Sequence, residues 1–169
     1  YFHALNGSME TGIMLSSTDL SSLVLEDVLF TAERNVTLLC YVRILASAPI
    51  TLRRLHFLSI GLHLDNKQPS SALPDMINLS ELGDHIVNSS ILIEDLRFEN
   101  TFGINFISIT KTHANITVRD MSLNITSFSH FLQVSGTDNV VEVYNISIID
   151  QTEKVHRDTK PSIFEMNLC

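Results

Sequence analysis

Cysteine is scarce in this chain of 169 residues, where only Cys40 and Cys169 are present. Small secreted domains often depend on several disulfides, so a fold of this composition must rely on its core instead. Basic residues are few as well: 11 Lys and Arg stand against 19 Asp and Glu, which gives a formal net charge of −8. This balance argues against nucleic-acid binding, which requires a surplus of positive charge.

Long apolar runs and long helical patterns are also missing. No run reaches the roughly 18 apolar residues of a membrane-spanning helix, so we expect no membrane span in this segment. Hydrophobic residues make up 44% and charged residues 18%, a composition typical of a folded chain. Because the chain begins at Tyr1 without a Met or a signal segment and stops abruptly, we interpret residues 1–169 as a single domain segment of a longer protein.

Asparagine indicates the cellular compartment. The 12 Asn and the 32 Ser and Thr residues would produce roughly two N-x-Ser/Thr sequons by chance. Seven are present, and an eighth of the rare Cys form begins at Asn167. This excess predicts covalent N-glycans and an extracellular or cell-surface location reached through the secretory pathway. The seven candidate N-glycosylation sites are Asn6, Asn35, Asn78, Asn88, Asn115, Asn124 and Asn145.

A repeat of about 25 residues organises the sequence. A hexamer with apolar residues at its first, fourth and sixth positions, and mostly polar residues at its second and third, occurs five times. A further apolar stretch begins eight residues after three of the copies, and after a longer polar connection in the last. The hexamers are residues 25–30, 52–57, 93–98, 118–123 and 143–148, and the later stretches are residues 38–41, 106–109, 131–134 and 163–166.

These segments predict three short strands in each repeat. Val, Ile, Thr and Phe alternate with polar residues at period two, and nothing sustains a helical period. A coil of three strands cannot close a core alone, so it must stack on its neighbours at the strand spacing of about 4.8 Å. We therefore predict an all-β fold: a right-handed parallel β-helix solenoid of about 5–6 rungs of roughly 25 residues, with three strands per rung.

The polar pair inside each hexamer must turn a corner if the strands on both sides face inward. Asp and Asn tolerate the left-handed backbone that a tight corner needs. Four of the five second positions fit, and Arg54 departs without an explanation at this level. The residues at this position are Asp27, Arg54, Asp95, Asp120 and Asn145.

The same register predicts where several sequons point. Counting from inward apolar neighbours places Asn35, Asn115 and Asn124 on the outside and Asn145 on a corner. Between Leu52 and Ile93 the spacing grows to 41 residues. We expect an insertion loop at about residues 64–87, with a return to strand at residues 76–79.

The rung pattern resembles the pectin-lyase-like β-helix superfamily over about residues 12–169, especially the non-enzymatic repeat regions of large surface proteins of microbial eukaryotes. The resemblance rests on periodicity and corner residues. The rival fold is a leucine-rich repeat, whose consensus also fits this period. Its buried Asn ladder has no counterpart here, because the corresponding positions hold Glu33, Ile60, Thr101, Thr126 and Gln151.

Many β-helix relatives act on polysaccharides, and hydrolysis of these needs two carboxylates a few ångströms apart. Asp95 and Asp120 are expected to stack one rung apart at ~5 Å, although their place in the corner series already explains them. The outward arginines could line a face or pair across rungs with Glu94, Asp95 and Asp120, and we favour pairing. These arginines are Arg53, Arg54, Arg97 and Arg119.

Other chemical signals are weak. The segment 136–139, Gly-Thr-Asp-Asn, is similar to the Asn-Thr-Asp of polygalacturonase-like enzymes, but the leading Asn, the companion Asp pair and the Gly-His-Gly are missing. The seven His share no metal-ligand spacing. The sequence therefore predicts no catalytic residue, no metal site and no cofactor.

Cys40 alternates with Leu38 in a third strand, which predicts a buried free thiol. Cys169 lies about four rungs further along, or ~19 Å at the strand spacing. A disulfide requires Cα atoms within ~7 Å, so we predict that the two cysteines are not bonded to each other. A disulfide of Cys169 would then have to be with a cysteine outside this segment.

The expected function is that of a non-enzymatic extracellular structural or interaction glycoprotein module. Its open rung edges suggest self-association or contact with other surface glycoproteins, end to end, into a surface assembly or filament. One alternative is a carbohydrate-active or carbohydrate-binding β-helix, of the polysaccharide lyase or hydrolase type. Another is an adhesin or receptor ectodomain, which an anchor in the flanking sequence would favour.

Overall fold

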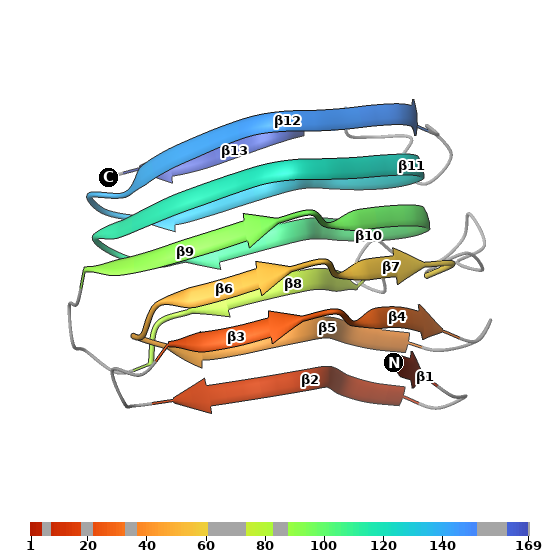
Figure 1. Ribbon diagram of the computed structural model, residues 1–169, viewed down its shortest axis with the longest axis horizontal. Coiled ribbons are helices and arrows are strands. Elements are labelled where there is room, and N and C mark those ends of the chain that lie inside the picture. Colours follow the sequence, from red (N-terminus) through yellow and green to blue (C-terminus); the bar gives the residue numbers. More distant parts are fainter. Residues whose placement is uncertain are drawn as a thin grey trace.

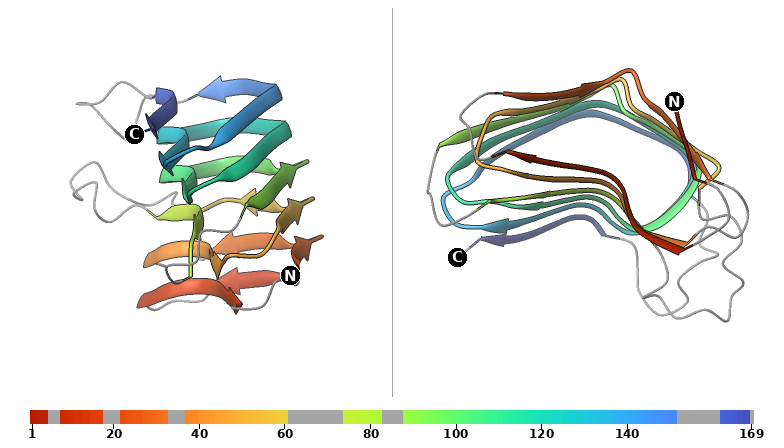
Figure 2. Two further views of the ribbon diagram at one scale, coloured as in Figure 1. Left: turned by 90° about the vertical axis from the view of Figure 1, so that its left-hand side faces the viewer. Right: turned by 90° about the horizontal axis from the view of Figure 1, so that it is seen from below.

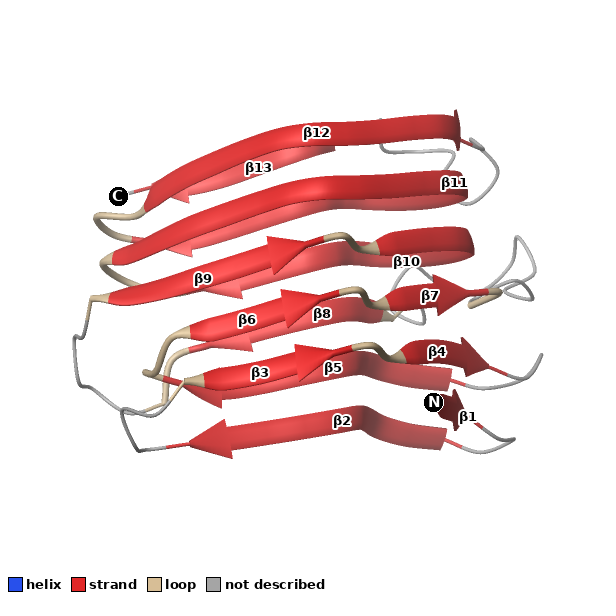
Figure 3. Ribbon diagram, in the orientation of Figure 1, coloured by secondary structure: helices blue, strands red, loops and turns tan. Residues whose placement is uncertain are grey.

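The computed structural model describes residues 1–4, 8–17, 22–32, 37–60, 74–82, 88–151 and 162–168. These residues form strands β1 to β13 and no helix (Figure 3). The strand pairings are parallel, and the chain winds into a β-solenoid whose coils stack from the N-terminal to the C-terminal end (Figure 1). Seen along the stack, the coils superimpose around one closed outline (Figure 2). The predicted all-β solenoid is therefore confirmed. The rival prediction of a leucine-rich repeat is wrong.

Each complete coil contributes one strand to each of three faces. The first face contains β3 (Leu23–Glu26), β6 (Ile50–Arg53), β9 (Ser89–Glu94) and the first parts of β11 (Ala114–Gly136) and β12 (Val140–Gln151). The second face contains β1 (Phe2–Ala4), β4 (Leu29–Ala32), β7 (His56–Leu58), the first part of β10 (Arg97–Thr110), the middle of β11 and the rest of β12. The third face contains β2 (Ser8–Ser17), β5 (Thr37–Ala46), β8 (Asp75–Ser80), the last parts of β10 and β11, and β13 (Ser162–Leu168).

The strand register reproduces the sequence repeat. The first residues of the five hexamers lie directly above one another in the first face: Leu25, Leu52, Ile93, Val118 and Val143. The later apolar stretches meet in the third face, where Ile107 lies between Ile77 and Leu132. Residues with the same place in the repeat therefore become neighbours in space.

The core follows from this register, because inward side chains of one coil lie on those of the next. Phe30 and Phe57 stack with ring centroids 4.6 Å apart, and Phe57 and Phe98 stack at 4.9 Å. All three rings are fully buried. Stacking of two buried rings stabilises the fold by about 0.5–1.5 kcal/mol, beyond the stabilisation from removing each ring from water.

The first corner, between the first and second faces, confirms the prediction from the polar pair. All five residues at this position have positive φ, from 51° at Asp95 to 57° at Asp27 and Asp120. Arg54 follows the rule as well, with φ 53°. Its guanidinium donates to both carboxylate oxygens of Asp27, with Nε–Oδ1 at 2.6 Å and Nη2–Oδ2 at 2.8 Å. This two-point contact with the coil below accounts for an arginine at a position that otherwise favours Asp or Asn.

The number of turns is lower than predicted. The solenoid makes about four turns, not five to six, because the first and last coils are incomplete within the described residues. The predicted return to strand after the insertion is confirmed, since β8 covers Asp75–Ser80. The stretch assigned to an insertion at 64–87 is therefore divided by a strand of the third face. Residues 61–73 and 83–87, on either side of that strand, lie outside the described residues.

We predict that the first corner tolerates glycine better than a β-branched residue. Asp95→Gly and Asp95→Val remove the same carboxylate, but the left-handed backbone costs an L-residue about 1–2 kcal/mol. Asp95→Val should therefore have the lower free energy of unfolding in urea titrations, by about that amount. Glu94 is the matched control because it lies one residue earlier in a regular strand, where Val is preferred to Gly. The same order of Val and Gly at both positions would refute this account of the corner.

Candidate functional site

A ladder of alternating charge runs along the first face, one residue before the corner. Glu26, Arg53, Glu94 and Arg119 lie in register in successive coils, and Tyr144 follows them. Arg53 pairs with Glu26, and Arg119 Nε donates to Glu94 Oε2 at 2.8 Å. The hydrogen bond from Arg53 lowers the pKa of Glu26. The predicted pairing across coils is thus confirmed for Arg119 with Glu94, whereas Arg53 pairs across coils with Glu26 instead. Arg97 lies nearest to Asp95 of its own coil.

The corner carboxylates Asp95 and Asp120 occupy equivalent places in adjacent coils, as expected. Asp120 Oδ1 accepts a hydrogen bond from Asn145 Nδ2 at 2.9 Å, and its Oδ2 lies 3.7 Å from Arg119 Nε. Asp95 Oδ1 lies 3.8 Å from Arg97 Nε. Both side chains are about half exposed. These contacts are those of solvated corner residues.

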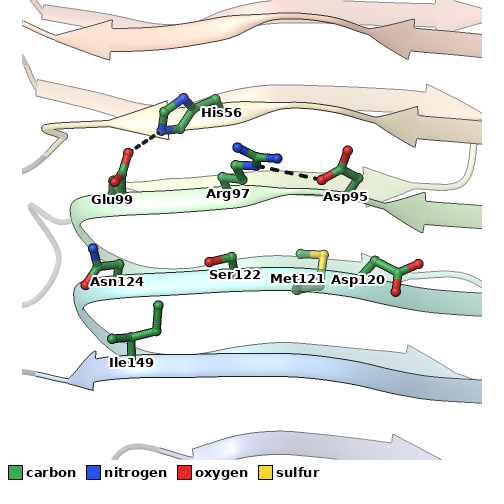
Figure 4. A pocket seen from close by; sticks show the side chains of 9 residues that line it. All are labelled: His56, Asp95, Arg97, Glu99, Asp120, Met121, Ser122, Asn124 and Ile149. Atoms are coloured by element: carbon green, nitrogen blue, oxygen red, sulfur yellow. Dashed lines mark hydrogen bonds and ion pairs between the residues drawn. The ribbon is translucent and has the colours of Figure 1, made fainter.

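A shallow depression lies beside this corner on the second face (Figure 4). Its volume is about 370 Å³, and a smaller hollow shares its residues His56, Asp95 and Arg97. Within it His56 Nε2 lies 2.8 Å from Glu99 Oε2. The residues lining the depression are His56, Asp95, Arg97, Glu99, Asp120, Met121, Ser122, Asn124 and Ile149.

The depression has a simple origin in the register. His56, Arg97, Ser122 and Ser147 form one outward column of the second face. The column changes from long side chains to short ones between Arg97 and Ser122, so the surface falls away at that step. Both polar groups and the apolar side chains of Met121 and Ile149 line the resulting hollow. Its open shape differs from the enclosed apolar pockets that bind most small molecules. Such a surface suits a hydroxyl-rich ligand.

The sequons that the structure describes lie on the outside of the solenoid. Asn88, Asn115 and Asn145 are exposed, and Asn124 and Asn78 are half-buried. The predicted outward direction of Asn115 and Asn124, and the corner position of Asn145, agree with the structure. Each of these five sequons is therefore placed where a glycan can reach solvent, with differences in the local space around it.

Two of these asparagines already use their side chains. Asn78 Oδ1 accepts a hydrogen bond from Ser80 Oγ at 2.9 Å. Burial raises the pKa of the half-buried Asp75, and hydrogen bonds with Asn105 and with the Asn78 side chain oppose this rise. Asn145 donates to Asp120, as described above. Asn6 and Asn35 lie outside the described residues, so the predicted direction of Asn35 remains a prediction.

The third corner, between the third and first faces, contains a buried lysine that the sequence did not reveal. The Lys111 side chain is 1% exposed, and its Nζ donates to the carbonyl oxygen of Ala46. Burial lowers the pKa of Lys111, and the nearby Glu81 opposes this effect. The Lys111 carbonyl accepts from Asn139 Nδ2 at 2.7 Å, and a Cβ on Gly136 would lie 1.9 Å from the Lys111 oxygen. Segment 136–139 is thus explained as a corner motif.

His56, His113 and His130 each have a different partner. His113 Nε2 lies 3.2 Å from Asp138 Oδ2 one coil away, and His130 contacts Asn105 at 3.0 Å. Across the ranges that the structure describes, no group of three or more His, Cys, Asp and Glu side chains is arranged to hold a metal ion. The side chains that come together do so by stacking between coils.

Cys40 is a free, buried thiol, as predicted. Its Sγ lies 3.2 Å from the carbonyl oxygen of Val42. Burial raises the pKa of this thiol to about 12. Cys169 lies outside the described residues.

Comparison with protein-family models, with curated proteins and with solved structures found no match to this chain. Within the described part of the chain, no helix is long and apolar enough to cross a membrane. The class of protein is therefore defined by its own fold: a parallel β-solenoid with three faces. Its distinguishing surface is the corner of stacked acids and arginines beside a shallow hollow with a mixed polar and apolar lining.

We predict that Cys40 makes the fold sensitive to alkaline pH. Because its pKa is raised from 9.0 to about 12, its contribution to stability is complete below pH 9 and is lost as the pH rises toward 12. Between pH 8 and pH 10 the free energy of unfolding should fall by about 1 kcal/mol more in the unsubstituted protein than in Cys40→Val. Urea titrations under reducing conditions measure this difference, and parallel pH profiles of the two proteins would contradict the prediction.

Proposed function

We propose that this chain is a non-enzymatic, extracellular structural or interaction module that carries N-glycans on its outer surface. The observation behind the proposal is that the described sequons lie at outward positions of the coils, whereas the inward positions are apolar. Seven sequons stand where chance would give roughly two, and the five within the described residues face outward. The inward positions form one continuous apolar column. In this proposal the solenoid is a rigid support. Glycans cover its outer sides, so that contacts with partners are made at surfaces without glycans, such as the ends of the stack.

The C-terminal end of the stack supports an interaction role. Val141, Val143, Ile146 and Ile148 of β12 are only half-buried, whereas the residues one coil below, such as Val118 and Leu123, are fully buried. Among the described residues, β12 pairs only with β11. A face of unpaired backbone groups and apolar side chains favours pairing with another strand edge. We propose self-association or contact with another surface glycoprotein at this end, as in a surface assembly or filament.

The resemblance to non-enzymatic pectin-lyase-like repeat regions agrees with this proposal. The second candidate is a carbohydrate-active or carbohydrate-binding protein, and the polar depression beside Asp95 and Asp120 is the observation that favours it. Turnover or binding of acidic and neutral polysaccharides separates it from the first. An adhesin or receptor ectodomain is a variant of the interaction role, and an anchor in the full reading frame would distinguish it.

We predict that the protein acquires several N-glycans when a eukaryotic host secretes it. Digestion with peptide-N-glycosidase F should lower its apparent mass, and mass spectrometry of the peptides should show Asn-to-Asp conversion at the exposed Asn88 and Asn115. A variant with Gln at all seven sequon asparagines is the control, and its mass should not change on digestion. Secretion of a folded protein with every sequon unmodified would overturn the proposed compartment.

We also predict concentration-dependent association through the C-terminal end. Val143→Lys places a charge at the inward, half-buried edge of the last coil, where burial of an unpaired charge is costly. Light scattering and negative-stain electron microscopy should show end-to-end oligomers for the unsubstituted protein and a shift to monomers for this variant. Leu39→Lys is the control because Leu39 is 56% exposed and lies in β5, which has a neighbouring strand on both sides. Monomers at all concentrations, with both variants folded by circular dichroism, would exclude self-association.

A further inference from the structure

Asn124 has surroundings that set it apart from the other described sequons. Its side chain lines the depression on the second face, next to Glu99 and Ile149 (Figure 4). Asn88 and Asn115 are exposed on the first-face side, and Asn78 and Asn145 have hydrogen bonds of their own. Asn124 is half-buried, yet no hydrogen bond joins its side chain to another described residue. Its amide is therefore available in a hollow that it helps to form.

Thr126, the third residue of the Asn124 sequon, supplies an independent observation. Its side chain is fully buried, and its hydroxyl has no hydrogen-bond partner. Thr101 occupies the same position one coil below and uses its hydroxyl, which donates to the carbonyl oxygens of Phe57 and Glu99. An unpaired buried hydroxyl costs about 1–3 kcal/mol. The fold gives no use for the Thr126 hydroxyl, whereas N-glycosylation of Asn124 requires it.

The lining of the depression fits a sugar. Arg97 is 65% exposed and has only a distant carboxylate, Asp95, at 3.8 Å, so most of its donors remain available. The carboxylate of Glu99 and the hydroxyl of Ser122 add an acceptor and a group that both donates and accepts. Ile149 is 68% exposed at the rim, where it offers an apolar contact to the carbon face of a pyranose ring. The volume of the depression is about 370 Å³.

We propose that this depression is the seat of the chain's own glycan: the innermost N-acetylglucosamine on Asn124 packs into it, against Arg97, Ser122 and Ile149. The inference rests on the proposed glycosylation and adds a specific place and partner to it. The hollow next to the corner acids is then filled by the protein itself. The same chemistry could come from a free saccharide, and the experiment distinguishes the two sources.

The test compares glycan release at two sites of the secreted, folded glycoprotein. Peptide-N-glycosidase F is added without denaturant, and peptides are analysed by mass spectrometry at successive times. A seat worth one or two hydrogen bonds should make release at Asn124 about tenfold slower than at the exposed Asn115. Arg97→Ala should bring the Asn124 rate toward the Asn115 rate and leave the Asn115 rate unchanged.

Matched variants control for the presence of each glycan. Thr126→Val removes the Asn124 sequon and keeps Asn124, and Thr117→Val does the same for Asn115. Because Val fills the space of Thr126 without an unpaired hydroxyl, the variant protein should fold. Only Thr126→Val should open the depression, so that added chitobiose shifts the NMR signals of Arg97 and Ser122. Thr117→Val and the unsubstituted glycoprotein should show no such shift.

The outcomes separate this inference from the proposed function. Equal release rates at Asn124 and Asn115 in the folded protein would show that the Asn124 glycan extends into solvent, and would overturn the inference alone. An unmodified Asn124 beside modified Asn88 and Asn115 would do the same. Binding of chitobiose to the unsubstituted glycoprotein at Arg97 would identify a site for an external saccharide instead. Absence of glycans at all seven sequons would overturn the proposed function as well.

Discussion

Parallel stacking in register is the constraint on which the whole molecule depends. No coil has a core of its own, because its backbone groups and inward side chains are completed only by the coils above and below. Residues with the same place in the repeat therefore contact one another directly. The residue type at one position is thus tested against the residues at the same position in the neighbouring coils. One result is the stack of buried rings formed by Phe30, Phe57 and Phe98. At the last coil the same rule leaves Val143 half-buried, since nothing in the described residues lies beyond it.

Stacking also constrains the charges on the outer surface, because side chains of like charge in one column would repel one another at the strand spacing. The first-face ladder solves this by alternation, with Arg53 between Glu26 and Glu94. The corner column includes an adjacent acid pair, Asp95 and Asp120, whose neighbours compensate for the charge. Asp120 accepts from Asn145, and Arg97 stands beside Asp95. Carboxylates brought together by a solenoid corner therefore need no catalytic explanation.

The sequence predicted those features that repeat. The corner residues, the inward columns and the burial of Cys40 all follow from counting along the hexamers, because period and backbone geometry decide them. Even Arg54 obeyed the backbone rule, although only the contact with Asp27 explains its side chain. Lys111 escaped detection because the groups that its ammonium faces, the Ala46 carbonyl and Glu81, belong to other coils and have no fixed spacing from it. At that third corner His113, Gly136 and Asp138 all have positive φ.

The depression shows why a candidate site on a solenoid must be sought across the chain and not along it. His56, Arg97 and Ser122 share the fifth position of the hexamer, where the residue type varies freely, and each is ordinary in its own strand. Only their column shows the step from long to short side chains that hollows the surface beside Asn124. The sequon marks Asn124 as a modification site, whereas the column determines whether its glycan has a surface to lie on. Exposed Asn115 lies outside this hollow, so two sequons with the same motif are expected to behave differently.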